Sequence, residues 1–293
     1  MILPLSLKAT TETYGLNTKV KVGGTWTVAK PHVKVGGTWT KVKRAYSKVG
    51  GVWNKTYDYE WVYTFANGVH TDIDIDTLAG IDKFHNVRIV IPSGATLVAS
   101  STSAYALQTG SGYTGILTIQ NSGKIIGRGG NGGNGGYGYS YNQIAQPTDG
   151  ASGGPSVLIQ SDVTIINTGT ILGGGGGGGG AAGIVHVGTA YSGGGGGGGG
   201  YPYGAGGSGG STTHSGANGT AGTVSSAGAG GNGGFDGTSG GGVGGTGGGL
   251  GAVGSLGGDV VGEHGGTHTI ESGQGAGGAT GATYYNPSSF TVS

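Results

Sequence analysis

The sequence predicts a mainly β protein with almost no α-helix, in which a β-repeat module and a base of β-rungs carry an antiparallel sandwich of polyglycine II helices with distal loops. Three observations predict this fold. A short motif recurs three times near the N-terminus, β-branched strand–turn–strand segments occupy the middle, and 64 of the 78 glycines of the 293-residue chain lie between Gly127 and Gly281. We therefore expect three parts, residues 1–57, 58–126 and 127–293, the last with a β insertion at 156–172.

The charge distribution follows the same division. Residues 1–57 contain ten Lys and Arg and one acid, whereas residues 129–293 contain six acids and no Lys or Arg. Because the two ends differ so strongly in charge, we expect them to meet different partners. The chain has no cysteine, which excludes a disulfide framework. It has no run of about 18 apolar residues, so we expect no membrane-embedded protein. Its start lacks a basic n-region, so we expect synthesis in a host cytoplasm without a signal peptide.

The N-terminal repeat reads VKVGGTWT at residues 20–27 and 33–40, and SKVGGVWN at 47–54. Alternation around a Gly-Gly pair predicts two short strands joined by a tight turn, in which the glycines take positive φ. Two interpretations stay open: three β units that share a Trp core, or a docking module for an acidic assembly. The Lys residues alternate with Val and form no continuous basic groove, so we expect no nucleic-acid partner. The candidate attachment residues are Trp26, Trp39, Trp53, Lys21, Lys34 and Lys48.

The β-rungs are expected at residues 87–100, 117–127 and 163–173, because each has a β-branched strand, a small polar turn and a second apolar strand. The second and third align closely, and each leads directly into a glycine run. We expect them to stack as an apolar base from which the glycine-rich region rises.

The segment TDIDIDT places Asp72, Asp74 and Asp76 on one face of a predicted strand. It lacks the central glycine and the final glutamate of an EF-hand loop. A solvated strand face is therefore the main interpretation, and a cation site is the alternative.

The glycine-rich region has a period of three. Two uninterrupted runs of eight glycines extend from Gly173 to Gly180 and from Gly193 to Gly200, and elsewhere non-glycine residues recur at every third position. A flexible coil need not keep such a period. An extended helix of three residues per turn has no internal hydrogen bonds, so its backbone groups must pair with adjacent helices. We expect the all-glycine runs inside a bundle and the interrupted runs outside, with every third side chain facing solvent or the base.

Loop lengths predict which end of the bundle carries recognition. If successive helices run antiparallel, the long connections at 181–192 and 212–220 share one end, and the short return at 201–203 lies at the other. Further loops are expected at 137–150, 235–239 and 256–271. Exposed Tyr, Ser, Asn and Gly on a rigid scaffold are typical of a recognition surface. The alternative is that the aromatic side chains of these loops cap the ends of the bundle and touch no ligand. The candidate receptor-binding residues are Tyr139, Tyr141, Asn142, His186, Tyr191, His214, Asn218, Phe235, Asp236, His264 and His268.

The sequence predicts no enzyme, cofactor or metal site. G-x-G-x-x-G matches are trivial in a region this rich in glycine and lack a strand–helix context. His264 and His268 are separated by glycines that do not favour a helix, which argues against a paired zinc ligand.

The runs GRGGNGG, GGGGGGGG and GGGGGGGGYPYGAGG resemble the tail-fibre-tip adhesins of T-even-like bacteriophages. The resemblance implies a polyglycine II scaffold whose variable loops, here 181–192 and 212–220, bind an outer-membrane protein or surface polysaccharide of the host. It also implies a constant turn at 201–203, a virion location at the distal end of a tail fibre and a fibre partner, expected to be a trimer tip. The VKVGGTW repeats resemble modules of other phage tail proteins. The alternatives are a tail-fibre assembly chaperone or structural tip protein without receptor contact, and a disordered glycine-rich linker.

Overall fold

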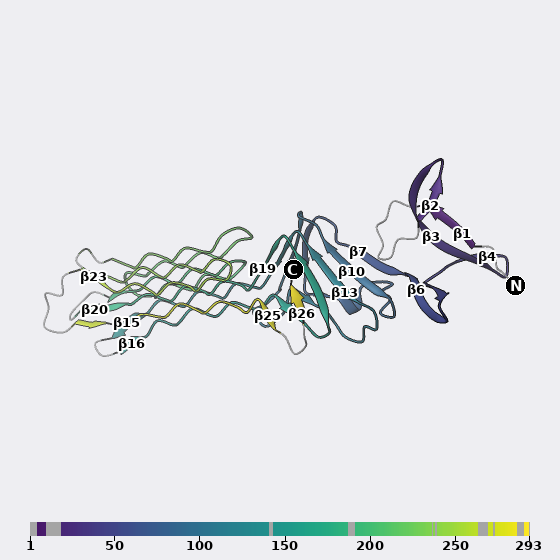
Figure 1. Cartoon of the computed structure of the whole chain (residues 1–293). Coiled ribbons are helices and arrows are strands. Elements are labelled where there is room, and N and C mark those ends of the chain that lie inside the picture. Colours follow the sequence, from purple (N-terminus) through teal and green to yellow (C-terminus); the bar gives the residue numbers. More distant parts are fainter. Residues whose placement is uncertain are drawn as a thin grey trace.

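The computed structural model describes residues 5–9, 19–140, 143–186, 191–235, 237, 239–262, 269–271, 273–285 and 290–292. The chain forms an elongated molecule with β-hairpins at one end, stacked strands in the middle and a glycine-rich body at the other end (Figure 1). As predicted, strands dominate: the part described contains one 3-10 turn, Ile75–Thr77, and no α-helix. None of the helical structure in these residues is long and apolar enough to cross a membrane.

The N-terminal repeats are β-hairpins. Their strands are β1 (Leu5–Ala9), β2 (Lys19–Val22), β3 (Thr25–Val35), β4 (Thr38–Lys41), β5 (Arg44–Val49) and β6 (Val52–Asp58). Strand β3 pairs with β2, β4 and β1, whereas β5 and β6 form a separate hairpin. Each Gly-Gly pair has φ between 55° and 87° at both positions. Such turns match the twist of a hairpin and require residues without a Cβ, so the predicted turns are confirmed.

The tryptophans of the repeats do not form a shared core in the part that the structure describes. Trp39 is 49% exposed and Trp53 is 66% exposed. Both repeats place a lysine opposite the tryptophan in register, Lys34 with Trp39 and Lys48 with Trp53. Each lysine Nζ lies 5.9 Å from the centre of the indole ring. The Lys21–Trp26 pair has the same register, but the Trp26 side chain lies outside the description. The hairpins therefore expose repeated Lys–Trp pairs.

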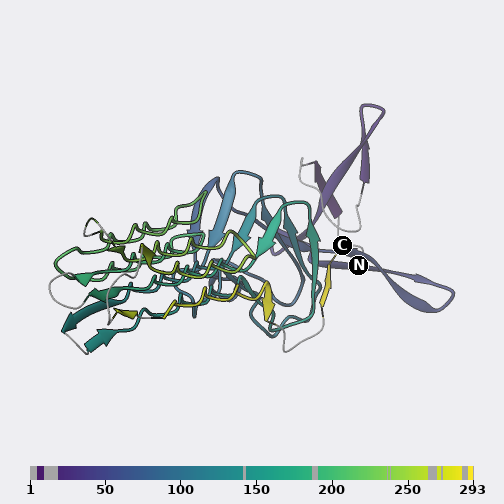
Figure 2. The same ribbon diagram turned by 90° about the vertical axis from the view of Figure 1, so that its left-hand side faces the viewer.

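The middle of the molecule is a three-sided parallel β-helix. Its first sheet contains β7 (Glu60–Thr64), β10 (Asn86–Ile91), β13 (Leu117–Asn121), β18 (Val163–Asn167) and β26 (Phe290–Val292). The second contains β8 (Gly68–Thr71), β11 (Ala95–Val98), β14 (Lys124–Ile126) and β19 (Thr170–Leu172). The third contains β9 (Ile73–Asp74), β12 (Leu107–Gln108), β17 (Val157–Leu158) and β25 (Tyr284–Tyr285). The chain visits the three faces in turn, so each coil stacks on the previous one (Figure 2).

The strand register explains the alignment seen in the sequence. Leu117 lies beside Val163 and Lys124 beside Thr170, as the alignment of the two segments predicts. Along β10 buried and half-buried residues alternate, because successive side chains of a strand point to opposite faces. Ile89, Ile119 and Ile165 stack in the centre with 1% exposure or less. At the first corner the fully buried Asn121 donates from Nδ2 to Asn167 Oδ1 at 2.8 Å, which links neighbouring coils.

The glycine-rich body consists of two excursions from this β-helix. Residues 127–156 connect β14 to β17, and residues 173–283 connect β19 to β25. Both connections therefore lie at the same corner of the β-helix, in successive coils. One coil earlier, residues 99–106 span that corner directly between β11 and β12. The C-terminal strands β25 and β26 return to the base and extend two of its sheets. Segments of the base and segments of the body therefore alternate along the chain.

The two all-glycine runs lie inside the body, as predicted. From Gly174 to Gly180, successive N–H groups donate in rotation to three neighbouring segments; the acceptors are the carbonyls of Gly154, Tyr201, Ala252, Ala151, Gly198, Ser255 and Thr148. Carbonyls of the same run accept from three other segments, around 130–133, 245–251 and 275–281. The run from Gly193 to Gly200 is surrounded in the same way. This threefold rotation is the pattern that a helix of three residues per turn requires.

Every third residue of the outer segments points away from the body. Asn131, Asn134, Ala205 and Ser208 are exposed, and so are Ala229, Asn232, Val243, Thr246, Ala276 and Ala279. At the inner glycines, by contrast, an added Cβ would lie closer to a neighbouring carbonyl oxygen than real Cβ contacts allow. The backbone groups of the interior are thus satisfied by neighbouring chains at a spacing that leaves no room for side chains.

The predicted solvated strand face at 72–76 is wrong, because the chain turns there. Strand β9 covers only Ile73 and Asp74, and Asp74 caps the 3-10 turn by accepting from the Asp76 N–H at 3.0 Å. Asp72 has a φ of 49° and accepts from the Ser100 N–H at 2.8 Å. Asp76 bonds to Lys83 Nζ at 2.7 Å and Tyr113 Oη at 3.0 Å. Each carboxylate has a protein partner, and the residues described hold no group of three potential metal ligands.

These contacts predict a loss of stability in acid. Burial acts to raise the pKa of Asp76, but hydrogen bonds from Lys83, the Ser111 N–H and Tyr113 outweigh it and hold that pKa below 3.8. The pKa of Asp82 is likewise lowered, since the hydrogen bond from Lys43 and the nearby His85 outweigh burial. Carboxyls with depressed pKa values stabilise the fold above their ordinary pKa and lose that contribution as pH falls. We expect the urea midpoint to be level from pH 7 to pH 5 and to fall below about pH 4. The Asp76→Asn variant should fall less steeply, and an equal fall would contradict this account.

Candidate functional site

The end of the body farthest from the base collects short strands from distant parts of the chain (Figures 1 and 2). They are β15 (Tyr137–Ser140), β16 (Gln143–Ala145), β20 (Ile184–His186), β21 (Tyr191–Ser192), β22 (Ser239–Gly240), β23 (Val261–Gly262) and β24 (Thr269–Glu271). We call this end the distal end. It contains residues of the predicted loop regions around 137–150, 181–192, 235–239 and 256–271.

Hydrogen bonding joins these elements into one surface. Strand β20 lies between β21 and β24, and β15 packs beside β20 and β21. Ser192 forms a parallel bridge with His214, which brings the turn at 212–215 to the same sheet. The Ser192 hydroxyl donates to the Ser239 carbonyl at 3.4 Å, which reaches the β22–β23 pair. Segments separated by more than a hundred residues therefore meet at the distal end.

The structure describes only some of the predicted receptor-binding residues. Phe235 is 61% exposed and His214 is half-buried. Asn218 is exposed, and its Oδ1 accepts from the Gly209 N–H at 2.9 Å, so this side chain also braces two segments of the body. Tyr139, His186 and Tyr191 lie in distal strands, but their side chains are outside the description. Tyr141, Asn142, Asp236, His264 and His268 lie outside the described residues altogether.

The predicted long loop at 212–220 is much shorter in the structure. Only residues 212–215 form a turn, since the N–H groups of Ala217, Gly219 and Thr220 donate to Asn232, Gly207 and Ala229 at 2.7–2.9 Å. Residues 216–222 are therefore a further segment of the body. Glycine occupies every third position of this segment, at Gly216, Gly219 and Gly222, but the segment lacks the paired glycines of the other outer segments, which is why the sequence pattern did not reveal it.

The opposite end of the body holds the short returns, including the predicted one at 201–203. These returns lie against the outer face of the second sheet of the β-helix. Tyr201 is buried, and burial raises the pKa of its hydroxyl. Tyr203 has a φ of 60°, and its ring lies 5.0 Å from the Arg128 guanidinium.

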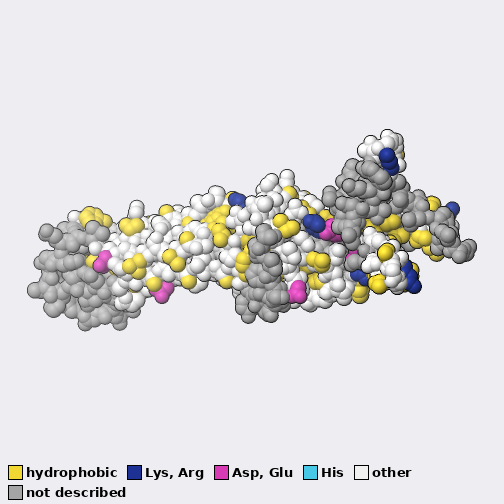
Figure 3. Space-filling model, viewed as in Figure 1, with side chains coloured by type: hydrophobic (Ala, Val, Ile, Leu, Met, Phe, Trp, Pro, Cys, Tyr) yellow, Lys and Arg dark blue, Asp and Glu magenta, His cyan; other side chains and the backbone are white. Residues whose placement is uncertain are grey.

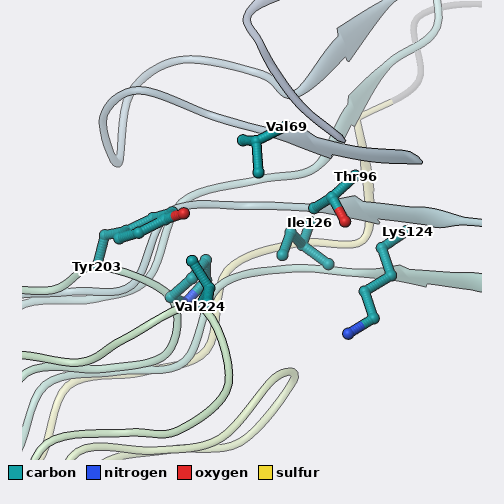
Figure 4. Close-up of a pocket in the computed structure, with 7 residues that line it drawn as sticks. Val69, Thr96, Lys124, Ile126, Tyr203 and Val224 are labelled. Atoms are coloured by element: carbon teal, nitrogen blue, oxygen red, sulfur yellow. The ribbon is translucent and has the colours of Figure 1, made fainter. Parts of the chain in front are cut away.

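A pocket of about 200 Å³ opens where these returns meet the base (Figure 4). Sequence reasoning missed it, because its walls come from separate coils of the β-helix and from two returns of the body. We call it the junction pocket; its lining residues are Val69, Thr96, Lys124, Ile126, Pro202, Tyr203 and Val224.

A charged cluster attaches the last hairpin to the base. Lys43 pairs with Asp82 at 2.5 Å, and Arg44 pairs with the buried Asp58 at 3.1 Å. Arg44 also donates to the Phe84 carbonyl at 2.7 Å. Beyond the cluster, basic side chains gather toward the hairpin end, whereas acidic ones appear along the body (Figure 3). The charge division predicted from the sequence thus runs along the long axis.

These features define a class of protein: a rigid scaffold that gathers loops at one end, on a base that carries basic hairpins at the other. The family described as phage tail fibre adhesin Gp38 matches residues 61–293. The chain belongs to this family of phage tail fibre adhesins. It is accordingly a virion-associated binding protein and not an enzyme, in agreement with the sequence prediction.

A solved structure of an adhesin complex is similar to the chain. It is described as the crystal structure of the gp37-gp38 adhesin tip complex of the bacteriophage S16 long tail fibre, with 28% identity, a TM-score of 0.44 and coverage of 80% of this chain and 82% of the other. A search of curated proteins gave no match. The family match starts at Trp61, the second residue of the β-helix, so the hairpins precede the matched range.

Proposed function

We propose that this adhesin is held at the distal end of a tail fibre by its N-terminal hairpins and binds a host receptor through the loops of its distal end. The receptor is an outer-membrane protein or a surface polysaccharide. In this proposal residues 1–57 attach, 58–126 form the base and 127–293 recognise the host on a polyglycine II scaffold, with the β insertion at 156–172 belonging to the base.

The observation that carries the proposal is the separation of the two surfaces. The hairpins and the distal end lie at opposite ends of an elongated molecule (Figure 1). Between them, the inner glycine runs are hydrogen-bonded on all sides, which favours a stiff body. A protein held at one end and stiffened in this way presents its other end outward. Recognition residues on loops of a rigid scaffold keep their geometry while their sequence varies.

The hairpins fit an attachment role by their chemistry. Residues 1–57 have nine more basic than acidic residues, and Trp39 and Trp53 are exposed beside lysines. Exposed tryptophans at an interface are common energetic anchors, and the positive charge favours an acidic surface on the fibre protein, which we expect to be a trimer.

Loop exchange tests the recognition part. Replacing residues 184–192 and 212–215 with the corresponding residues of a relative of different host range should transfer that host range, because these segments meet on one surface. Adsorption to the original host should fall at least about tenfold, which corresponds to the loss of a few modest contacts. Thermal unfolding of the purified chimera should match that of the parent.

The matched control is the exchange of residues 249–253, a largely exposed turn at the opposite end of the body that does not line the junction pocket. It should leave host range unchanged. If the distal exchange also left host range unchanged while the chimera stayed folded and virion-bound, the distal end would not be the receptor surface.

A further inference from the structure

We propose that the junction pocket is a second binding site, which takes one acidic sugar ring from a surface polysaccharide and holds its carboxylate on Lys124. This inference rests on the proposed function, since it gives the adhesin a glycan contact away from the distal end. It adds to that function a ligand class, acidic sugars, and the residues of the junction pocket that would bind them.

The pocket walls suit the C–H face of a sugar ring. Val69 and Val224 are 56% and 53% exposed, although both are aliphatic, and Ile126 and Pro202 add further apolar surface to the lining. Figure 4 shows the Tyr203 side chain directed from the body toward Val69 and Thr96. Aromatic and aliphatic surface with a polar tip is the usual lining of a small-molecule site.

The polar groups of the pocket select an anion with hydroxyls. Lys124 makes no hydrogen bond or ion pair within the part of the chain that the structure describes, and the lining contains no Asp or Glu. An ammonium without a carboxylate partner offers strong donors to an anion. The hydroxyls of Thr96 and Tyr203 both donate and accept hydrogen bonds, as sugar hydroxyls require. An acidic sugar matches this combination better than a neutral sugar or a simple anion does.

Tyr203 is held in a conformation that needs support. Its φ of 60° is uncommon for a residue with a Cβ, and such strain persists only where the surroundings impose it. Here the buried Pro202 precedes Tyr203 and the Arg128 guanidinium lies 5.0 Å from its ring. A ring fixed before the ligand arrives lowers the entropic cost of binding.

The size of the pocket limits the ligand to about one ring. A volume of about 200 Å³ is smaller than the roughly 300–1,000 Å³ of sites for drug-sized molecules. Thr96 lies between Val69 and Lys124 in the parallel ladder, so these three side chains form one row across the outer face of the second sheet. One ring bound along this row would be a weak contact alone and effective only as part of a repeated polymer.

Titration of the full-length protein with sodium glucuronate tests the proposal, with saturation-transfer NMR as the readout. We expect a dissociation constant on the order of 1 mM, and binding at least fivefold weaker for glucose and for acetate. Lys124→Ala and Thr96→Val should each weaken glucuronate binding at least fivefold. Thr170→Val is the matched control, since Thr170 follows Lys124 in the same row but does not line the pocket.

Three results would overturn the proposal: no glucuronate binding, binding that Lys124→Ala leaves intact, or acetate binding as tight as glucuronate binding, which would indicate a simple anion site. The titration is also independent of the proposed function. The distal loop exchange should leave glucuronate binding unchanged. The host-range experiment therefore tests the proposed function alone, and the titration tests the pocket proposal alone.

Discussion

Replacing Gly177 by alanine is expected to unfold the glycine-rich body. Gly177 lies in the inner run, and an added Cβ would come within a forbidden distance of the Asn131 carbonyl oxygen. The obstructing atom is a backbone oxygen that itself accepts from the Ala151 N–H at 2.8 Å. The Gly177 N–H donates to the Ala151 carbonyl at 2.8 Å, so Asn131 and Gly177 cannot move apart without breaking hydrogen bonds. Overpacking typically costs about 1–3 kcal/mol, and we expect the upper end of this range here because the obstructing atom is backbone. Calorimetry should show a lower or absent unfolding transition and a lower soluble yield.

Gly249→Ala is the matched control for this prediction. Gly249 belongs to the same body and its backbone is not left-handed, but an added Cβ there meets nothing within 4 Å. Because alanine restricts the unfolded chain more than glycine does, this variant should be neutral or up to about 1 kcal/mol more stable. Equal stability of the two variants would show that the interior tolerates side chains and that the tight packing of the body is not required.

Removing the two exposed indoles, Trp39→Ala together with Trp53→Ala, should weaken binding to the fibre protein of the same phage about 1,000-fold. The estimate takes each tryptophan as an anchor of about 2 kcal/mol. Both side chains are about half exposed or more, so their loss should leave the unfolding temperature nearly unchanged. Biolayer interferometry with the immobilised fibre protein measures the change, and phage assembled with the variant should carry less adhesin.

Phe84→Ala provides the control for the tryptophan variants, because Phe84 is an aromatic residue on the base that is more exposed than either tryptophan. It should leave fibre binding unchanged. Raising the salt concentration should weaken binding of the parent protein, since the hairpins carry most of the positive charge. Undiminished binding of the double variant would reject the hairpins as the attachment surface and leave the base as the next surface to test.

The sequence predicted the candidate surface in outline. Alternation of antiparallel segments predicted that the loops at 181–192 and 212–220 share one end, and Ser192 and His214 form a bridge in the structure. It gave the wrong length for 212–220, because the backbone from residue 216 onward pairs with neighbouring segments of the body, as Thr220 does with Ala229. It gave no sign of the junction pocket, since Val69, Thr96 and Lys124 meet only when successive coils stack.

What the sequence alone determined about this protein is its local geometry. Gly-Gly pairs permit the positive φ of the hairpin turns, alternation of Val and Ile gives the strands, and the absence of side chains decides which glycine runs lie inside. Only the tertiary structure decided that the strands close into a three-sided coil, that both excursions leave at one corner, and that Phe290 pairs with Val163. Those features depend on contacts between residues far apart in the chain. The periodicity of a single segment predicts its own conformation but not which distant segments it will contact.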